Sequence, residues 1–174
     1  MPVSPEDLFA FLDTLGIEHQ TVEHEPVYTV NDGAEWRDKV AGLHCKNLFL
    51  KDKKGGVWLV VMPADKRADL GKISQRAGAP RMSFGSPELM LEVLGLSPGS
   101  VTPFALMNDT ERLVTVILDR DMMASKLVNY HPLHNAASTT LCSAGLMKFL
   151  NALGYEPVTM DCGSGADALS NTGS

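Results

Sequence analysis

The sequence has few cysteines and lacks any long apolar run. Its 174 residues include only Cys45, Cys142 and Cys162, which are widely spaced and contain no CxxC pair. Neither a disulfide framework nor a zinc ribbon is therefore expected, and all three cysteines are predicted to be reduced. The longest apolar stretch, residues 57–62, is far shorter than the roughly 20 residues that a membrane-spanning helix needs. We therefore expect no association with a membrane.

The amino-terminal residues also lack a targeting pattern. Residues 1–7 contain no basic patch followed by an apolar run, so a cytoplasmic location is expected. His131 and His134 have a spacing that some metal sites use, but Pro132 separates them and neither an HExxH motif nor a carboxylate partner accompanies them. The sequence therefore predicts chemistry without a metal or another cofactor.

Basic residues are concentrated in one part of the chain. The formal net charge is −6, which taken alone argues weakly against nucleic-acid binding. Between Lys46 and Arg81, however, nine basic residues accompany three acidic ones, a local charge of +6 that leaves −12 on the rest. This asymmetry suits a domain that meets a phosphate backbone with one face. The predicted RNA contacts are Lys53, Lys54 and Lys72, although the first two also fit a solvated hairpin turn.

Capping residues and hydrophobic periodicity predict an α+β fold. A single domain is expected over residues 1–162, followed by a disordered tail over 163–174. Short helices and strands alternate without a regular βαβ repeat, which indicates a mixed sheet. The expected helices cover residues 5–15, 29–42, 69–77, 86–95 and 143–153. The expected strands cover residues 19–24, 44–50, 57–62, 81–84, 102–107, 113–118, 126–129 and 157–160, with the 51–56 hairpin at the centre of the sheet.

Lys46 is an unusual residue because it lies within the apolar strand segment 45–50. Side chains alternate along a strand, so Lys46 shares a face with Leu48 and Leu50, opposite Asn47. If that face is interior, the ammonium group needs a partner or a ligand. The alternative is an exposed or snorkelling lysine at the end of a strand.

Two loops could supply further chemistry. Gly99 lies in the Gly/Pro-containing segment 96–104, where the backbone can approach a ligand and its N–H groups can hold a carbonyl or an oxyanion. Most such loops are only turns. His131 and Asn135 follow a predicted strand, and an imidazole and an amide can orient water or a substrate carbonyl. The alternative for Asn135 is a hydrogen bond to its own backbone.

A cysteine nucleophile is a third possibility. Cys45 neighbours His44, but adjacent residues on a strand point to opposite faces. Cys142 precedes a predicted helix, where a thiol pKa can be lowered, and His131 would be its base. We expect both cysteines to serve packing in the interior instead.

Ordered landmarks over residues 4–158 resemble the YbaK-like aminoacyl-tRNA editing domain, which also occurs inserted in bacterial prolyl-tRNA synthetases. These landmarks are the segment 24–29 (HEPVYT), Lys46, the segment 99–104 (GSVTPF) and the segment 131–135 (HPLHN). Their joint order and spacing carry the resemblance. Within the family, the sequence is most similar to stand-alone proteins that act on alanyl-tRNA for proline.

The resemblance implies a mixed, partly barrel-like sheet flanked by helices, with a small pocket for the aminoacyl ester at the RNA terminus. It implies that Lys46 contacts the substrate end of the RNA, that Gly99 offers its backbone to the ester and that His131 shapes the amino-acid pocket. The implied substrate-binding neighbours are Val30, Asn47, Pro103 and Asn135.

The activity that the resemblance implies is hydrolysis of the ester that joins a wrong amino acid, above all alanine, to tRNA(Pro). An aminoacyl ester is already activated, so a positioned water and stabilisation of the oxyanion can suffice. A pocket too small for proline would provide selectivity. Cys-tRNA(Pro) deacylation and a non-catalytic sensor of an amino acid or aminoacyl-tRNA are the alternatives. The expected partners are mischarged tRNA(Pro) and prolyl-tRNA synthetase, and no DNA.

Overall fold

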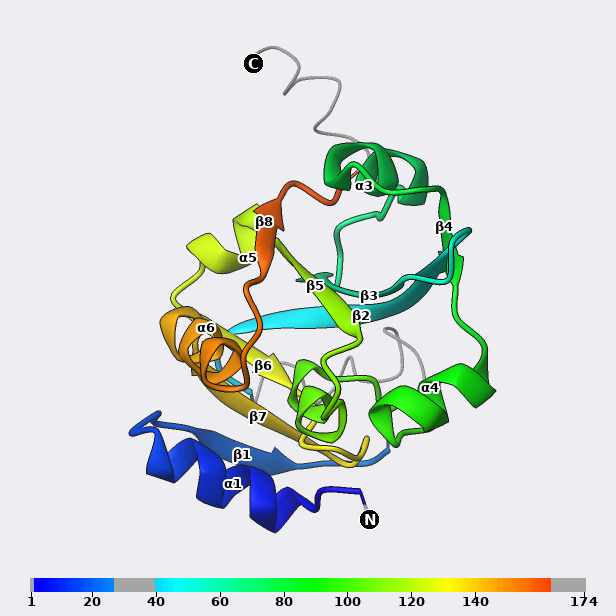
Figure 1. Cartoon of the computed structure of the whole chain (residues 1–174). Helices are drawn as coiled ribbons and strands as arrows, with labels where there is room; N and C mark the ends of the chain where they lie inside the picture. The colour runs from blue at the N-terminus through cyan, green and yellow to red at the C-terminus, as the bar shows by residue number, and fades with distance from the viewer. Residues whose placement is uncertain (1, 27–39, 164–174) are drawn as a thin grey trace.

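The computed structural model describes residues 2–26 and 40–163 (Figure 1). The predicted helix over 29–42 and the predicted tail over 163–174 lie almost wholly outside the described residues. The helices are α1 (Pro5–Thr14), α3 (Leu70–Ala77), α4 (Pro87–Leu94), the 3-10 helix η2 (Pro103–Asn108), α5 (Arg120–Ala124) and α6 (Ser143–Ala152). The strands are β1 (Gln20–Glu23), β2 (Leu43–Asp52), β3 (Val57–Pro63), β4 (Met82–Phe84), β5 (Val114–Asp119), β6 (Leu127–Tyr130), β7 (Ala137–Cys142) and β8 (Val158–Met160).

Local capping explains most of the helices, as predicted. Before α1, the Ser4 hydroxyl accepts a hydrogen bond from the Asp7 N–H, and the Asp7 carboxylate accepts one from the Ser4 N–H. This capping box satisfies two N–H groups that the helix itself leaves unpaired. Ser86 caps α4 in a similar way, and α3 ends at Gly78, whose φ of +68° favours glycine. The predicted helices over 5–15, 69–77, 86–95 and 143–153 are confirmed.

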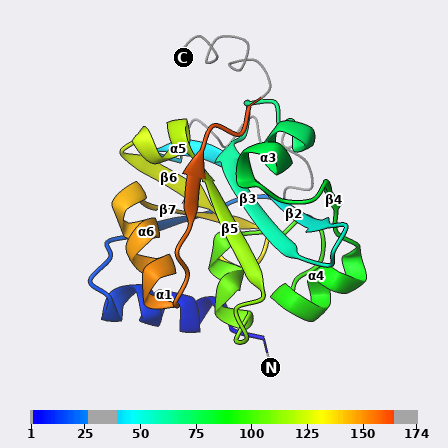
Figure 2. The ribbon, with the colours of Figure 1, turned by 45° about the horizontal axis from the view of Figure 1, so that its top comes forward.

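The sheet is mixed and open. Its strands follow the order β1-β7-β6-β2-β3-β5-β8, with β4 paired to β2 (Figure 2). The predicted hairpin of β2 and β3 is confirmed at its centre, and the predicted edge strand β8 is confirmed at one end. The β2–β6, β3–β5 and β5–β8 pairs are parallel, whereas the other pairs are antiparallel. The sheet curves without closing, because β1 and β8 are its two ends.

Three segments differ from the prediction. The strand predicted over 102–107 is wrong, because Thr102 accepts a hydrogen bond from the Phe104 N–H and Pro103 begins η2. Strand β7 was missed, since its Ser and Thr residues resemble a polar loop, although they are buried between β1 and β6. Helix α5 was also missed; the carboxylate of Asp119 caps it by accepting hydrogen bonds from two backbone N–H groups.

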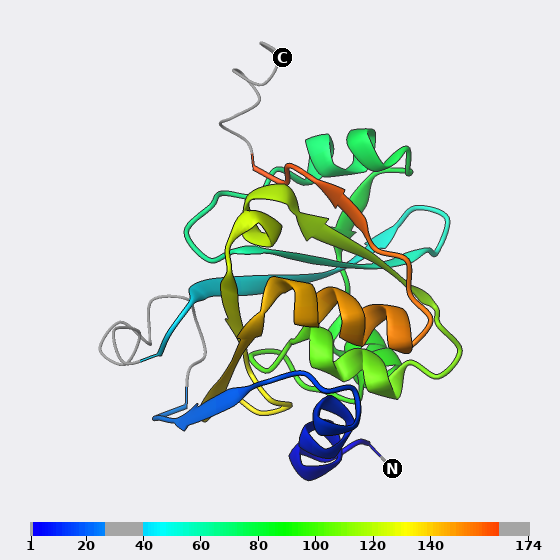
Figure 3. The same cartoon turned by 90° about the vertical axis from the view of Figure 1, so that its left-hand side faces the viewer.

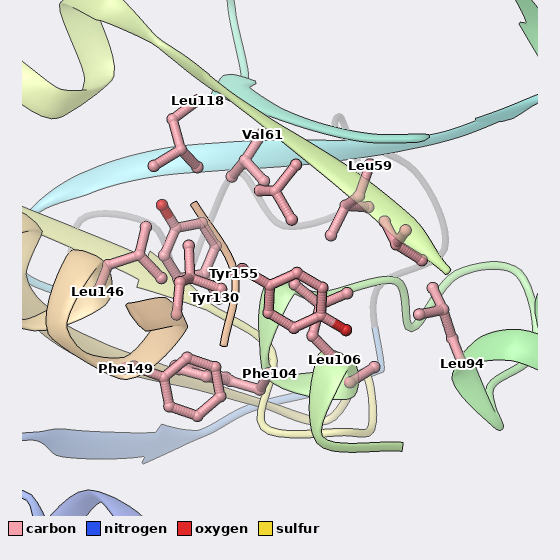
Figure 4. Close-up of a cluster of buried hydrophobic side chains, with 14 of the residues drawn as sticks. Leu59, Val61, Leu94, Phe104, Leu106, Leu118, Tyr130, Leu146, Phe149 and Tyr155 are labelled. Carbon is pink, nitrogen blue, oxygen red and sulfur yellow. The ribbon is translucent and has the colours of Figure 1, made fainter. Parts of the chain in front are cut away.

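Two apolar clusters lie on opposite faces of the central strands. The larger cluster fills the space inside the curved sheet, where α6 and η2 lie between its two halves (Figure 3). Its members include Leu59, Phe104, Tyr130 and Phe149 (Figure 4). A smaller cluster on the other face packs β2, β3 and β5 against Ile73 of α3. Within the described residues, no helix has the length and apolar character needed to cross a membrane.

Candidate active site

The outer face of the sheet, away from the larger core, is polar where β2, β6 and β7 meet. His44 pairs with Asn129, which in turn pairs with Thr140. Paired residues share a face of the sheet, and here that face lies opposite the buried Val128. The Asn129 amide and the Thr140 hydroxyl both donate hydrogen bonds to the Ala41 carbonyl, at 3.0 and 3.1 Å. This ordered polar face borders the position of Lys46.

Lys46 points to the outer face, as the predicted alternation requires. Leu48 packs against the smaller cluster on this side, whereas Cys45 packs against the larger core. Lys46 is half-buried and makes no hydrogen bond or ion pair with any described residue. Burial lowers the pKa of its ammonium group, which the negative charge of Asp65 only partly offsets. The side chain therefore offers a partly desolvated cation that an anionic ligand would stabilise.

His131 lies next to this lysine in the register of the strands. Strands β2 and β6 run parallel, and their last paired residues are His44 and Asn129. At the next position, Cys45 and Tyr130 both pack into the larger core on the inner face. Extending the register once more places Lys46 beside His131 on the outer face, where β6 ends. A cation and an imidazole from distant parts of the sequence thus share one border of the sheet.

A second histidine, to which the sequence reasoning gave no role, accompanies His131. The His131 Nδ1 atom lies 2.8 Å from the Ala137 carbonyl oxygen. The His24 Nε2 atom lies 3.0 Å from the Ser138 hydroxyl, and the two imidazole centroids are 6.0 Å apart. His24 and Ser138 escaped the prediction because β7, which places Ser138 beside β1, was not recognised. The only signal for His24 was its place at the start of the HEPVYT landmark.

The loop after His131 is held in an unusual conformation. Leu133 has a φ of +74°, in the left-handed region that costs about 1–2 kcal/mol for a residue with a side chain. Its side chain packs against the larger core, and the Ala136 N–H donates a hydrogen bond to His134 Nδ1. Asn135 is half-buried in this loop. Packing therefore fixes the loop beside His131.

The glycine loop approaches β2 from the inner face. The Asn47 amide nitrogen donates a hydrogen bond of 3.1 Å to the Val101 carbonyl, whereas its buried Oδ1 atom has no hydrogen-bond partner in the part of the chain that the structure describes. Gly99 has a φ of +97°, a conformation that favours glycine, and Pro103 is buried at the start of η2. The structure thus joins Asn47 to the glycine loop on the inner face of β2. On the outer face, the extended register of β2 and β6 places Lys46 toward His131.

The remaining predicted site residues lie elsewhere. Val30 is outside the described residues. Lys53 and Lys54 are exposed in the β2–β3 turn, whose N–H groups the Asp52 carboxylate holds. That turn is roughly 23 Å along the strand from Lys46. Lys72 is half-buried in the first turn of α3.

Lys66, counted in the basic segment, has a structural role. Its Nζ atom lies 3.0 Å from Asp119, 2.6 Å from Asp121 and 3.1 Å from Asp161. Burial disfavours the ammonium group, but the three carboxylates outweigh burial and raise the pKa of Lys66. Lys66 therefore ties the ends of β5 and β8 to the segment after β3, and it is not available to RNA.

The geometry of the cysteines does not favour a thiol nucleophile. Burial raises the pKa of the Cys45 thiol to about 12, and its side chain points away from the face that carries His44. Cys142 is exposed, which corrects the expected buried position, and its sulfur accepts a hydrogen bond from the Gly145 N–H. It lies at the opposite end of β7 from the residue that His131 contacts, roughly 17 Å away.

Within residues 2–26 and 40–163, neither a group of metal ligands nor the hollow beside α4 coincides with the site. Among the described residues, no three His, Cys, Asp or Glu side chains are grouped as metal ligands. A hollow of about 210 Å³ lies between α4 and residues 96–98, and none of the predicted site residues lines it. The site is therefore defined by the strand register and the hydrogen bonds.

Comparison with known proteins gives a consistent result. Residues 24–149 match the model of the aminoacyl-tRNA editing domain. Prolyl-tRNA synthetase associated domain-containing protein 1 of Danio rerio is 39% identical over 157 residues, which cover 89% of this chain and 85% of that protein. The prolyl-tRNA editing protein ProX of Acetoanaerobium sticklandii is 34% identical over 148 residues, covering 84% and 90% of the two chains.

A solved structure shares the fold. It is described as a proposed trans-editing enzyme for prolyl-tRNA synthetase, and it matches with a TM-score of 0.72 at 22% identity, over 95% of this chain and 99% of that chain. The resemblance to the YbaK-like fold and the expected mixed sheet with flanking helices are thus confirmed. The family model and the similar sequences together show that the chain belongs to the aminoacyl-tRNA editing domain family.

Proposed function

We propose that the protein is a trans-editing hydrolase that deacylates mischarged tRNA(Pro), with Ala-tRNA(Pro) as its main substrate. The observation that carries this proposal is Lys46, a partly desolvated cation with no hydrogen-bond or ion-pair partner among the described residues, on the polar face where the β2–β6 register extends toward His131. In a member of an aminoacyl-tRNA editing family, such a cation fits the polyanionic end of a transfer RNA. The relatives named for prolyl-tRNA support proline-specific transfer RNA as the carrier.

The proposed reaction is direct hydrolysis of the ester. A water oxygen attacks the ester carbonyl carbon, the bond from that carbon to the ribose oxygen breaks, and the ribose oxygen takes up a proton. We assign Lys46 to hold the substrate end of the RNA at the outer face of β2. Stabilisation of the developing oxyanion is assigned to a backbone N–H of the Gly99 loop, which reaches the edge of β2 from its inner face. A neighbouring hydroxyl of the terminal ribose assists the water. The products are the free amino acid and uncharged tRNA(Pro).

Selectivity in this scheme depends on the size of the amino-acid pocket. We assign one wall of this pocket to His131, with Asn47, Pro103 and Asn135 as further lining residues. A methyl side chain fits a pocket that is too small for the proline ring, so correctly charged tRNA(Pro) escapes hydrolysis. Cysteine is the next candidate, because its side chain is only slightly larger than that of alanine.

Two other functions compete with this proposal. A thiol hydrolase is disfavoured by the high pKa of the Cys45 thiol and by the distance between Cys142 and the His131 contact. A non-catalytic sensor of aminoacyl-tRNA would need the same cation and the same loop, so only an activity measurement separates it from the hydrolase. We place the reaction in the cytoplasm and expect prolyl-tRNA synthetase as a functional partner.

The decisive test measures release of alanine, cysteine and serine from charged tRNA(Pro) by the purified protein. We expect alanine to be released fastest and Lys46→Ala to reduce that rate at least about 100-fold, an effect typical of losing a transition-state contact. Lys148→Ala is the matched control, because Lys148 is an exposed lysine on α6. No release of any of the three would favour the sensor. Release that survives Lys46→Ala but disappears in Cys142→Ser would favour the thiol scheme.

A further inference from the structure

We infer that His131 recognises the free α-amino group of the ester-linked amino acid, by accepting a hydrogen bond at Nε2. This inference rests on the proposed function and adds a second level of selectivity to it. The size of the pocket selects the side chain, whereas His131 selects an aminoacyl ester over an acyl ester without an amine.

The hydrogen bond at Nδ1 determines which nitrogen of His131 carries the proton. The atom 2.8 Å from Nδ1 is the Ala137 carbonyl oxygen, which can only accept. The Nδ1 atom must therefore be the donor, and in the neutral ring the lone pair lies on Nε2. Among the described residues, Nε2 has no hydrogen-bond partner. His131 thus presents a free acceptor whose orientation the backbone of β7 determines.

The neighbouring His24 is fixed by the same logic, but its acceptor is already used. Its Nδ1 atom lies 2.8 Å from the Glu25 carbonyl oxygen, so that nitrogen must donate. The Nε2 atom of His24 then accepts from the Ser138 hydroxyl at 3.0 Å. Of the two neighbouring imidazoles, whose centroids are 6.0 Å apart and whose rings are tilted by 57°, His131 keeps a lone pair for a ligand.

The surroundings keep His131 neutral, as an acceptor must be. Burial lowers the pKa of its imidazole, and positive charge on His24 or His134 would lower it further, although the Ala137 carbonyl opposes this. An α-amino group is a hydrogen-bond donor in both its protonated and its neutral form. A neutral imidazole next to Lys46 therefore complements the amine without adding a second positive charge to the site.

The test compares two esters that differ only at the α-carbon. Alanyl-tRNA(Pro) carries the amine, and propionyl-tRNA(Pro) carries a hydrogen in its place. Single-turnover rates are divided by the spontaneous hydrolysis rate of each ester, because the amine itself activates the ester. We expect the wild-type protein to prefer the alanyl ester by roughly 10- to 100-fold, the range for a hydrogen bond to a charged group. In His131→Phe, which keeps a ring but has no lone pair, this ratio should fall close to one.

Control variants distinguish a failure of the inference about His131 from misfolding and from a failure of the proposed function. His134→Phe removes the exposed neighbouring imidazole and should leave the ratio unchanged. His131→Leu, a second variant without an acceptor, should lose the preference as His131→Phe does, which guards against a variant that fails to fold. If the wild type and both His131 variants preferred the alanyl ester over the propionyl ester to the same degree, the inference about His131 would be wrong, while the proposed function would be unaffected. A wild-type protein that releases no alanine would instead contradict the proposed function.

Discussion

Two lysines on either side of β3 have opposite environments. Lys66 touches three carboxylates, which raise the pKa of its ammonium group, and it joins three segments of the fold. Lys46 is half-buried without a partner among the described residues, and burial lowers its pKa. A cation whose charge is balanced inside the protein stabilises the fold, whereas a partly desolvated cation left unbalanced is suited to a ligand. Environment, more than residue type, therefore separates the structural lysine from the functional one.

The largest expected effect on stability comes from removing the balanced lysine. Lys66→Met should lower the free energy of unfolding by about 3–5 kcal/mol, because it leaves Asp119, which is 0% exposed, without its cation and leaves Asp161 with a single ion pair among the described residues, the 3.6 Å contact to Arg120. Urea denaturation at pH 7 measures this loss. A loss below about 1 kcal/mol would mean that the carboxylates are protonated or that solvent reaches them.

Removing the unbalanced lysine should have little effect on stability. Lys46→Met should change the free energy of unfolding by at most about 0.5 kcal/mol, since no described contact of the ammonium group is lost. The lowered pKa of Lys46 gives the sign of its electrostatic contribution to folding stability. The folded protein releases this proton at a lower pH than the unfolded chain, so the charged lysine disfavours folding and its removal cannot weaken the fold electrostatically. The same denaturation experiment would contradict this comparison if Lys46→Met were as unstable as Lys66→Met.

RNA affinity should depend on three other lysines of the basic segment: Lys53 and Lys54, which are exposed, and Lys72, which is half-buried. Replacing Lys53, Lys54 and Lys72 by Gln should weaken tRNA binding and reduce the slope of log affinity against log salt by about 2, as expected for three lost phosphate contacts. Binding titrations at several salt concentrations measure the slope. Replacement of Lys126 and Lys148, which are also exposed, is the control and should leave it unchanged. An unaltered slope in the triple variant would mean that these three lysines do not contact the RNA and serve only solubility.

The smallest expected effect is the contribution of His131 to the loss of folding stability at acidic pH. Its folded-state pKa is lower than that of the unfolded chain, so the unfolded chain binds the extra proton first as the pH falls. The stability that comes from the neutral ring is therefore complete above about pH 6.5, the ordinary histidine value, and decreases below it. His131→Phe should lose less stability than the wild type between pH 7 and pH 5. Parallel curves for the two proteins would contradict this.

Local signals predicted much of the fold. The Ser4 and Ser86 caps and Gly78 act within one helical turn, so the sequence alone located α1, α3 and α4. Strand β7 has no comparable local signal. Its polar residues are ordered by β1 and β6 and by the Ala41 carbonyl, which the chain brings together only on folding.

The candidate site shows the same division. Strand alternation correctly gave the face of Lys46, which is a local property. Its neighbour His131 follows from the parallel pairing of β2 with β6, about which the local pattern says nothing. Likewise, the sequence pattern placed Lys66 among the basic residues that could face RNA. The aspartates that balance its charge lie 53 to 95 residues further along the chain, so no local pattern identified them as its partners.

The most direct measurement compares single-turnover release of alanine from Ala-tRNA(Pro) by the wild type, Lys46→Met and Lys148→Met, per folded molecule at pH 7. If Lys46 holds the RNA end of the substrate, the Lys46 variant should lose at least about 100-fold in rate while keeping its folding stability. The Lys148 variant should match the wild type. Equal alanine release by all three folded proteins would contradict a hydrolytic site at Lys46.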